Sequence, residues 1–223
     1  MNLCFDLDGP IIDVSDRYYR AYLESLIGTG ANSDHILRKE DFWKLKQNRI
    51  SDLEIGILSG LSVKDSITAS EARRDLNFKE DFLYMDKVFD DVFDTFEYIK
   101  SKNINFFVVT LRRKKQLNPT IKQFKLNKYI NLDKFFPLAD EEKIQNDIQG
   151  KHILVVNAHR RLGLNTQETW IIGDSDTDVH VGRLARLGKI IAIDRGIRSR
   201  EQLEVLRPDY LINNLKELTG FLS

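Results

Sequence analysis

Two carboxylates lie two residues apart near the start of the chain, in Asp6-Leu7-Asp8, directly after the short apolar run Leu3-Cys4-Phe5. The turn residues Gly9 and Pro10 follow at once, so a strand that stops at Asp6 would put its side chain at the rim of a sheet. Two acids this close need a cation or a shared proton, because adjacent negative charges oppose each other's ionisation. The pattern indicates either a cation site or a solvated turn.

Two further apolar runs end in polar residues of a suitable kind. Residues Phe106-Phe107-Val108-Val109 lead into Thr110, and Trp170-Ile171-Ile172 lead into Gly173-Asp174. In an open parallel sheet the carboxyl ends of all strands lie at one edge, which is where ligands bind. We therefore expect these polar residues to meet the acid pair at one edge of a sheet.

An amphipathic segment that Lys151 opens lies between these two runs. Its apolar residues share one helical face, and they are Leu154, Val155, Ala158 and Leu162. Gly163 follows as the expected helix stop. The chain thus carries four motifs in order. The first is a strand that ends in Asp-x-Asp, the second a strand that ends in Thr110, and the third a helix that Lys151 opens. The fourth is a strand that ends in Gly-Asp-x-x-x-Asp, whose last residue is Asp178.

This order resembles the haloacid dehalogenase (HAD) superfamily, in particular its phosphoglycolate-phosphatase-like members. The matching positions are Asp6-Leu7-Asp8-Gly9, Thr110, Lys151, and Gly173-Asp174 with Asp178. The tail from Asp194 to Ile212 also looks like the end of those phosphatases. The resemblance covers nearly the whole chain, although residues 15–85 match in placement more than in sequence. Pro10 is the one departure in the first motif, because threonine or valine is common there.

The resemblance implies a Mg²⁺-dependent phosphatase that hydrolyses a small phosphomonoester through an aspartyl-phosphate intermediate. Asp6 would be the nucleophile, and Asp8 would be the acid for the leaving alcohol and then the base for water. The phosphoryl oxygens would be bound by Thr110, Lys151 and backbone amides around Leu7 and Leu111.

The resemblance also implies the metal ligands. Mg²⁺ prefers hard oxygen ligands, and the expected set is Asp6, Asp8 through its backbone carbonyl, Asp174, and Asp178 in support of the metal's waters or of Lys151. The four histidines, His35, His152, His159 and His180, lack metal-ligand spacing, so zinc is not expected.

Several other charged residues receive weaker assignments. The basic run Arg112-Arg113-Lys114-Lys115 reads as a solvated helix start, but Arg112, two residues past Thr110, is a candidate substrate contact. Asp176 reads as a solvated loop residue. In the loop Lys46-Gln47-Asn48-Arg49-Ile50, Arg49 or Lys46 could meet an anionic leaving group, with a solvated loop as the alternative.

The pattern of elements after residue 87 predicts a parallel sheet covered by helices on both faces, because strands and helices alternate with short connections. The expected strands include Phe135–Leu138 at an edge, where Pro137 is tolerated, and the pair Ile190–Ile193 and Tyr210–Ile212. The expected helices are 88–102, 151–162 and 179–187, the last one closed by Gly188. The fold class is a doubly wound α/β core.

The segment from Ser15 to Met85 instead shows helical signals. Ser51-Asp52-Leu53-Glu54 is a capping box, and Ser62 with Asp65 starts another helix. We expect a core at 1–14 and 86–223 with a helical cap at 15–85; in the family it resembles, such an insert is a mobile cap over the active site. The aromatic residues expected in the cap's own core are Phe42, Trp43, Phe78, Phe82 and Tyr84.

Composition limits the partners. The 34 basic and 34 acidic residues balance, so charge gives no case for nucleic acid or an anionic membrane. Cys4, the only cysteine, is expected to be a small buried hydrophobe. The chain has no membrane-span or signal-peptide pattern. We expect a cytoplasmic monomer or weak homodimer that binds a small phosphorylated metabolite.

The sequence bears on four alternative functions. Asp8 argues against a dehalogenase, which needs no acid for its leaving group. A phosphonate hydrolase would need a buried cap lysine, and nothing marks Lys39, Lys44 or Lys46 as buried. A phosphomutase would keep the same core site, and it remains open. A regulatory protein that binds phosphate or Mg²⁺ without turnover also remains open, although it would have no use for Asp8. Phosphoglycolate, a sugar phosphate and a nucleoside monophosphate are all possible substrates.

Overall fold

The computed structural model describes residues 1–222, and the chain forms two compact units. The first unit, which we call the core unit, comprises Met1–Asp13 and the chain from Val88 onward. The second, which we call the helical unit, comprises Val14–Lys87. Among the described residues, no helix is both long enough and apolar enough to cross a membrane.

The core unit contains a six-stranded sheet in the order β5-β4-β1-β6-β7-β8, with every neighbouring pair parallel. The strands are β1 (Asn2–Phe5), β4 (Asn105–Arg113), β5 (Phe135–Leu138), β6 (Thr169–Gly173), β7 (Lys189–Ile193) and β8 (Tyr210–Ile212). The chain order reverses at β1, whose Phe5 lies beside Val108 of β4 and Ile172 of β6. Such a switch point opens a crevice at the carboxyl ends of the strands. The predicted doubly wound α/β fold is confirmed.

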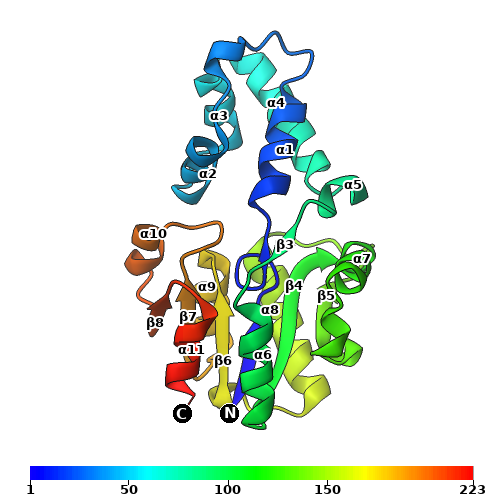
Figure 1. Cartoon of the computed structure of the whole chain (residues 1–223), viewed down its shortest axis with the longest axis vertical. Helices are drawn as coiled ribbons and strands as arrows, with labels where there is room; N and C mark the ends of the chain where they lie inside the picture. The colour runs from blue at the N-terminus through cyan, green and yellow to red at the C-terminus, as the bar shows by residue number, and fades with distance from the viewer. Residues whose placement is uncertain (223) are drawn as a thin grey trace. The chain divides into compact units, whose positions relative to one another are not determined.

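Helices cover both faces of this sheet (Figure 1). They are α6 (Val92–Ser101), α7 (Lys114–Phe124), α8 (Asp147–Leu162), α9 (Asp176–Leu184), α10 (Arg200–Val205) and α11 (Leu215–Phe221). In the view of Figure 1, α6 and α11 lie in front of the sheet while α8 and α9 lie behind it. Short 3-10 turns lie at Leu126–Lys128, Leu132–Lys134 and Thr166–Glu168.

The central strand is apolar on both sides because both faces are covered. Cys4 is fully buried with Val155 of α8 and Ile171 of β6, and burial raises the pKa of its thiol well above the ordinary value. On the opposite face the ring of Phe5 contacts those of Phe96 and Phe106, with centroids 5.8 and 6.2 Å away. The expectation of a small buried hydrophobe at Cys4 is confirmed.

Two predicted helix starts are wrong. Helix α8 begins at Asp147, where the side chain of Asn146 caps the first turn, so Lys151 lies in the second turn rather than at the start. Helix α6 begins at Val92 rather than at residue 88. Phe89 precedes the helix, and its N–H donates to the carbonyl of Ile11 at 3.2 Å.

The predicted helix 179–187 is displaced. Helix α9 starts at Asp176 because Ser175 caps it, and it ends at Leu184 before Arg186 takes a left-handed φ of 53°. Gly188 does not close this helix. It is needed because a Cβ there would lie 2.1 Å from the Gln167 carbonyl oxygen. The strand through Thr110 is also longer than expected, since β4 continues to Arg113.

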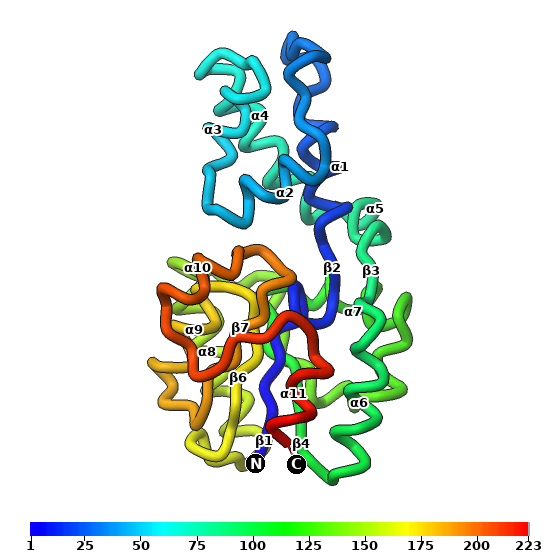
Figure 2. Tube along the Cα trace, turned by 60° about the vertical axis from the view of Figure 1, so that its left-hand side comes forward, coloured from blue at the N-terminus to red at the C-terminus, as the bar shows by residue number. Residues whose placement is uncertain are grey.

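The helical unit contains five α-helices among its described residues (Figure 2). They are α1 (Ser15–Ser25), α2 (Lys39–Gln47), α3 (Asp52–Leu58), α4 (Val63–Leu76) and α5 (Glu80–Leu83), with a 3-10 turn at Ser33–His35. The predicted caps at Ser51 and Ser62 are present. Of the five aromatics expected in its core, Phe42 is fully buried, but Phe78 and Tyr84 are exposed and the prediction is wrong for them.

The two chain connections between the units run through a two-stranded sheet of β2 (Ile12–Asp13) and β3 (Lys87–Val88). Within the helical unit, Arg17 Nε lies 2.9 Å from Asp86 Oδ1, and both side chains are buried. Lys87 Nζ lies 2.6 Å from Asp16 Oδ2. Residues near the start of the helical unit are therefore held to residues at its end by ion pairs.

Candidate active site

The site starts where the chain leaves β1. The Asp6 N–H donates to the Ile172 carbonyl at 2.9 Å, and the Leu7 N–H donates to Asp6 Oδ1 at 2.8 Å. A tight turn follows, in which the Gly9 N–H donates to the Ile12 carbonyl at 2.9 Å. Gly9 has a φ of +94°, a conformation open to glycine at no steric cost. The turn therefore sets the directions of Asp6 and Asp8.

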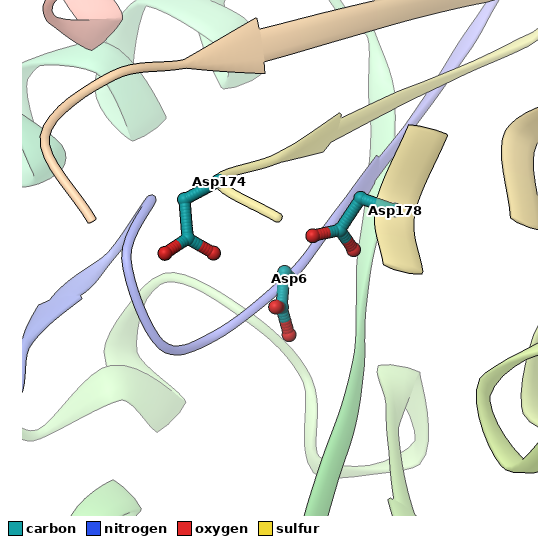
Figure 3. A group of neighbouring side chains, drawn as sticks. All are labelled: Asp6, Asp174 and Asp178. Atoms are coloured by element: carbon teal, nitrogen blue, oxygen red, sulfur yellow. The ribbon is translucent and has the colours of Figure 1, made fainter. Parts of the chain in front are cut away.

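Three carboxylates gather at this edge of the sheet. Asp6, Asp174 and Asp178 each offer an oxygen, and these oxygens lie within 4.8 Å of one another. Figure 3 shows the three side chains side by side, at the ends of β1 and β6 and in the first turn of α9. The parallel register brings Asp6 and Asp174 together, as the sequence predicted for the two strand ends.

Lys151 of α8 reaches into this group of carboxylates. Its Nζ lies 2.7 Å from Asp6 Oδ2 and 2.5 Å from Asp178 Oδ1, and the side chain is 3% exposed. Burial works to lower the pKa of Lys151, but the charges of Asp178 and Asp6 outweigh it, and the pKa lies above the ordinary value. Lys151 is therefore a protonated ammonium, and it forms ion pairs with two of the three carboxylates, Asp6 and Asp178.

One cation among three buried carboxylates leaves an excess of negative charge. Burial raises the pKa of Asp6 to about 7, with Lys151 opposing the shift and Asp178 adding to it. Burial and the neighbouring charges of Asp6 and Asp178 raise the pKa of Asp174 well above its usual range. Because oxygen donors of this charge suit a hard divalent cation, these residues could hold a metal ion.

Asp174 is held in place by its backbone surroundings. Its Oδ2 accepts the Ile197 N–H at 2.5 Å. A Cβ added at Gly9 would lie 2.1 Å from Asp174 Cγ, and one added at Gly196 would lie 1.9 Å from Asp174 Oδ2. Glycine is required at both positions because the backbone approaches the carboxylate so closely. The sequence pattern of the tail around Gly196 predicted no role for this glycine.

Asp178 is engaged through both oxygens. Oδ2 accepts the Ser175 N–H at 3.1 Å and the Ser175 hydroxyl at 2.6 Å, which forms the capping box of α9. Oδ1 faces Lys151. A Cβ at Gly173 would lie 2.0 Å from Asp178 Cγ. The acid is therefore fixed between the first turn of α9 and the ammonium.

Thr110 and Asp8 lie on neighbouring segments of the same edge. Thr110 is buried, and its Oγ1 accepts the Arg112 N–H at 3.1 Å. The Asp8 side chain is not among the three clustered carboxylates. It pairs with Arg112, whose Nε and Nη2 lie 2.8 and 2.7 Å from Asp8 Oδ1.

Arg112 and Asp176 both pair with a charged partner, so the prediction of a wholly solvated basic run and a merely solvated Asp176 is wrong. Arg112 is 3% exposed, so the run of four basic residues is not uniformly solvated. Asp176 is the first residue of α9 and pairs with Arg198 Nε at 2.8 Å. In both cases a partner from a distant part of the chain supplies the opposite charge, which a local pattern cannot show.

Sequence reasoning missed Arg195, whose side chain binds the backbone of the turn after β1. Its guanidinium donates to the Pro10 carbonyl, lies 2.7 Å from Asp91 Oδ1 and sits 4.0 Å from the centre of the Phe89 ring. Asp91 in turn accepts the Leu215 N–H at 2.6 Å. The position of Arg195 beside Gly196, in the tail from Asp194 to Ile212, is the one signal for it in the sequence.

Arg49 lies in the helical unit, just after α2 ends at Gln47. It is exposed and takes a left-handed φ of 65°. Lys46, the alternative contact, lies within α2 and its Nζ is 2.5 Å from Asp52 Oδ1. Lys46 is therefore already paired within its own unit.

Comparison with known proteins places this geometry in a family. The chain matches the family model described as haloacid dehalogenase-like hydrolase over residues 3–192. It is 22% identical over 219 residues to the pyrophosphatase PpaX of Bacillus mycoides, covering 98% of this chain and 95% of that protein. It is 21% identical over 220 residues to a phosphorylated carbohydrates phosphatase of Thermotoga maritima, covering 96% and 97%.

The fold is also similar to that of solved structures. One is a haloacid dehalogenase-like family hydrolase from Streptococcus pneumoniae, with a TM-score of 0.75 and 19% identity, covering 100% of this chain and 98% of that one. The family model spans most of the chain, and the switch-point sheet with its acidic edge agrees with it. The protein is a member of the haloacid dehalogenase-like hydrolase family.

Proposed function

We propose that this hydrolase is a Mg²⁺-dependent phosphatase that acts on a small phosphomonoester through an aspartyl-phosphate at Asp6. The observation that carries the proposal is the contact of 2.7 Å between Asp6 and Lys151 inside a group of three acids at the switch point. The relatives named as a pyrophosphatase and a carbohydrate phosphatase support a small phosphorylated substrate.

Asp6 is the nucleophile in this proposal. One of its oxygens bonds to phosphorus while the bond between phosphorus and the leaving oxygen breaks. Asp8 gives its proton to that leaving oxygen. Asp8 then takes a proton from water, which attacks the acyl phosphate, releases phosphate and restores the Asp6 carboxylate.

The phosphoryl oxygens are bound by Thr110, Lys151 and the backbone amides around Leu7 and Leu111. The Thr110 oxygen already accepts the Arg112 N–H, which leaves its hydroxyl proton to donate to a phosphoryl oxygen. Lys151 supplies a positive charge to the transferring group, where the negative charge of the transition state is spread.

Asp6, the backbone carbonyl of Asp8, and Asp174 are the proposed ligands of the cation, and Asp178 supports Lys151. When bound, the divalent cation neutralises charge so that an anionic nucleophile can approach an anionic phosphate. The excess negative charge of the cluster and the glycines around Asp174 fit such an ion.

We also propose that the helical unit is the cap and that Arg49 contacts an anionic leaving group. The chain enters this unit after β2, a few residues beyond Asp6, and leaves it at β3, so the unit is an insertion in the sequence between β1 and the rest of the core unit. A cap that closes would exclude water and complete the specificity surface.

The test is a steady-state assay of the purified protein with an aryl phosphate and a panel of natural esters. The panel includes phosphoglycolate, sugar phosphates, nucleoside monophosphates and pyrophosphate. We expect turnover with Mg²⁺, loss of turnover with excess chelator, and recovery when Mg²⁺ is restored. Undiminished turnover in chelator contradicts the metal. Phosphoryl transfer to a second hydroxyl without release of phosphate identifies a mutase, and binding of Mg²⁺ with no turnover of any ester identifies a binding protein.

A further inference from the structure

The side chain of Arg112 contacts Asp8 and is the more deeply buried of the two. Its Nε and Nη2 are 2.8 and 2.7 Å from Asp8 Oδ1. The Arg112 side chain is 2% exposed and that of Asp8 is 31% exposed. The arginine therefore approaches Asp8 from the protein interior, and the exposed side of the carboxylate is turned toward solvent.

The other end of the guanidinium is anchored in helix α7. Arg112 Nη1 donates to Thr120 Oγ1 at 2.7 Å, and the Thr120 hydroxyl donates to the Gln116 carbonyl at 3.1 Å. Thr120 is 1% exposed. One planar group thus joins the turn after β1 to the first turns of α7, and its own backbone N–H is bound to Thr110.

We propose that Arg112 is a positioning residue for Asp8 and not a contact to the substrate. The inference rests on the proposed phosphatase activity, in which Asp8 transfers the proton of the leaving group. Asp8 lies in a turn, where a short side chain would otherwise sample several rotamers. A fixed guanidinium fork anchored on Thr120 holds the carboxylate in one place, and a misplacement of 1 Å can cost about 10²-fold in rate.

The experiment compares an alkyl and an aryl phosphate with wild type, Arg112→Gln, Thr120→Val and Asp8→Asn. Arg112→Gln should lower kcat on the alkyl ester by about 10²-fold with little change in KM. The loss should shrink on the aryl ester, whose leaving group needs little protonation. Thr120→Val should show the same dependence on the leaving group with a smaller loss. The exposed neighbour Lys114, changed to Gln, is the matched control and should behave like wild type.

Double substitution separates positioning from substrate binding. If Arg112 acts through Asp8, then Asp8→Asn with Arg112→Gln should be no slower than Asp8→Asn alone. Additive losses, or a rise in KM that is equal for both esters, overturn the proposal in favour of a substrate contact. Wild-type rates for Arg112→Lys, which keeps the charge but not the fork, also overturn it.

Thermal unfolding of each variant shows whether it is folded. If Arg112→Gln does not fold, Thr120→Val decides, because it leaves the arginine in place and removes only its anchor. If the wild-type enzyme turns over neither ester, the proposed function is overturned, and this inference is overturned with it. A different result overturns the positioning role alone. In that case the wild-type enzyme turns over both esters, and the rate losses of Asp8→Asn and Arg112→Gln add in the double variant.

Discussion

The ammonium of Lys151 lies 2.7 Å from Asp6 Oδ2, at the point where the central strand of the sheet ends. The same Nζ lies 2.5 Å from Asp178, whereas Asp174 receives a backbone N–H from Ile197. The contact keeps the proposed nucleophile next to a fixed positive charge, and it leaves the group of acids with an unbalanced negative charge. Both consequences can be tested.

Replacing Asp6 by Asn should abolish turnover, because an amide cannot form the acyl phosphate. The amide oxygen can still accept the Leu7 N–H that Asp6 Oδ1 accepts in the wild type. The measurement is phosphate release, combined with mass spectrometry of acid-quenched enzyme to detect the phosphoryl adduct. The exposed Asp209, changed to Asn, is the control and should retain activity. An adduct formed by Asp6→Asn would place the nucleophile elsewhere.

Replacing Lys151 by Met should destabilise the metal-free protein by roughly 3–5 kcal/mol, the usual cost of leaving a buried charge without its partner. Asp6 and Asp178 would then face each other without the ammonium. The measurement is urea unfolding in the presence of a chelator. Lys189→Met breaks an exposed pair with Asp209 and should change stability little. Equal stability of the two variants would mean that Lys151 does not compensate the buried acids.

Binding of Mg²⁺ and a rise in pH should change the free energy of unfolding in opposite directions. The folded-state pKa values of Asp6, at about 7, and of Asp174 lie above the ordinary aspartate value of 3.8. The folded state therefore binds more protons than the unfolded state, and the contribution of these groups to stability falls as pH rises from about 4 to 7. A cation that replaces those protons should stabilise, by about 2.7 kcal/mol at 100 times its Kd.

The variant that checks this is Asp174→Asn, studied by urea unfolding from pH 4 to 8 with and without Mg²⁺. Without metal it should be more stable than wild type above pH 7, and the difference should vanish toward pH 4. It should also lose the stabilisation by Mg²⁺. A wild-type protein whose stability does not respond to Mg²⁺ at pH 8 would speak against a cation at these acids.

Replacing Gly196 by Ala should displace Asp174, since the new Cβ would lie 1.9 Å from its Oδ2. We expect a large loss of Mg²⁺ affinity, measured by titration calorimetry, together with loss of turnover. Gly220→Ala is the matched control. Its Cβ would meet nothing within 4 Å, and alanine is the better helix former in α11 by about 1 kcal/mol. Unchanged Mg²⁺ affinity in Gly196→Ala would show that Asp174 can move without consequence.

Replacing Arg49 by Asn should raise KM for a substrate with a charged leaving group while leaving turnover of a small aryl phosphate nearly unchanged. Loss of uniform binding at a remote group affects KM more than the chemical step. Asn is chosen because Arg49 has a φ of 65°, which Asn tolerates. The exposed Arg74, changed to Gln, is the control in the same unit. Wild-type kinetics for Arg49→Asn on a charged natural ester would place the specificity residues elsewhere.

Features that depend on neighbouring residues could be predicted from the amino-acid sequence alone. The apolar runs before Asp6 and Asp174 predict strand ends, and parallel strands bring such ends to one edge whatever the rest of the chain does. The helix caps at Ser51 and Ser62 and the stop at Gly163 were equally predictable, because each depends on hydrogen bonds or backbone angles within one turn.

Which charged side chains pair with each other depends instead on the three-dimensional fold. Arg112 and Asp8 are 104 residues apart in sequence, and the local pattern around Arg112 is that of a solvated basic helix start. Its burial follows from the packing of α7 against β4, which puts Thr120 within reach of the guanidinium. A long side chain takes the partner that the fold brings near it, and periodicity along the chain carries no information about that partner.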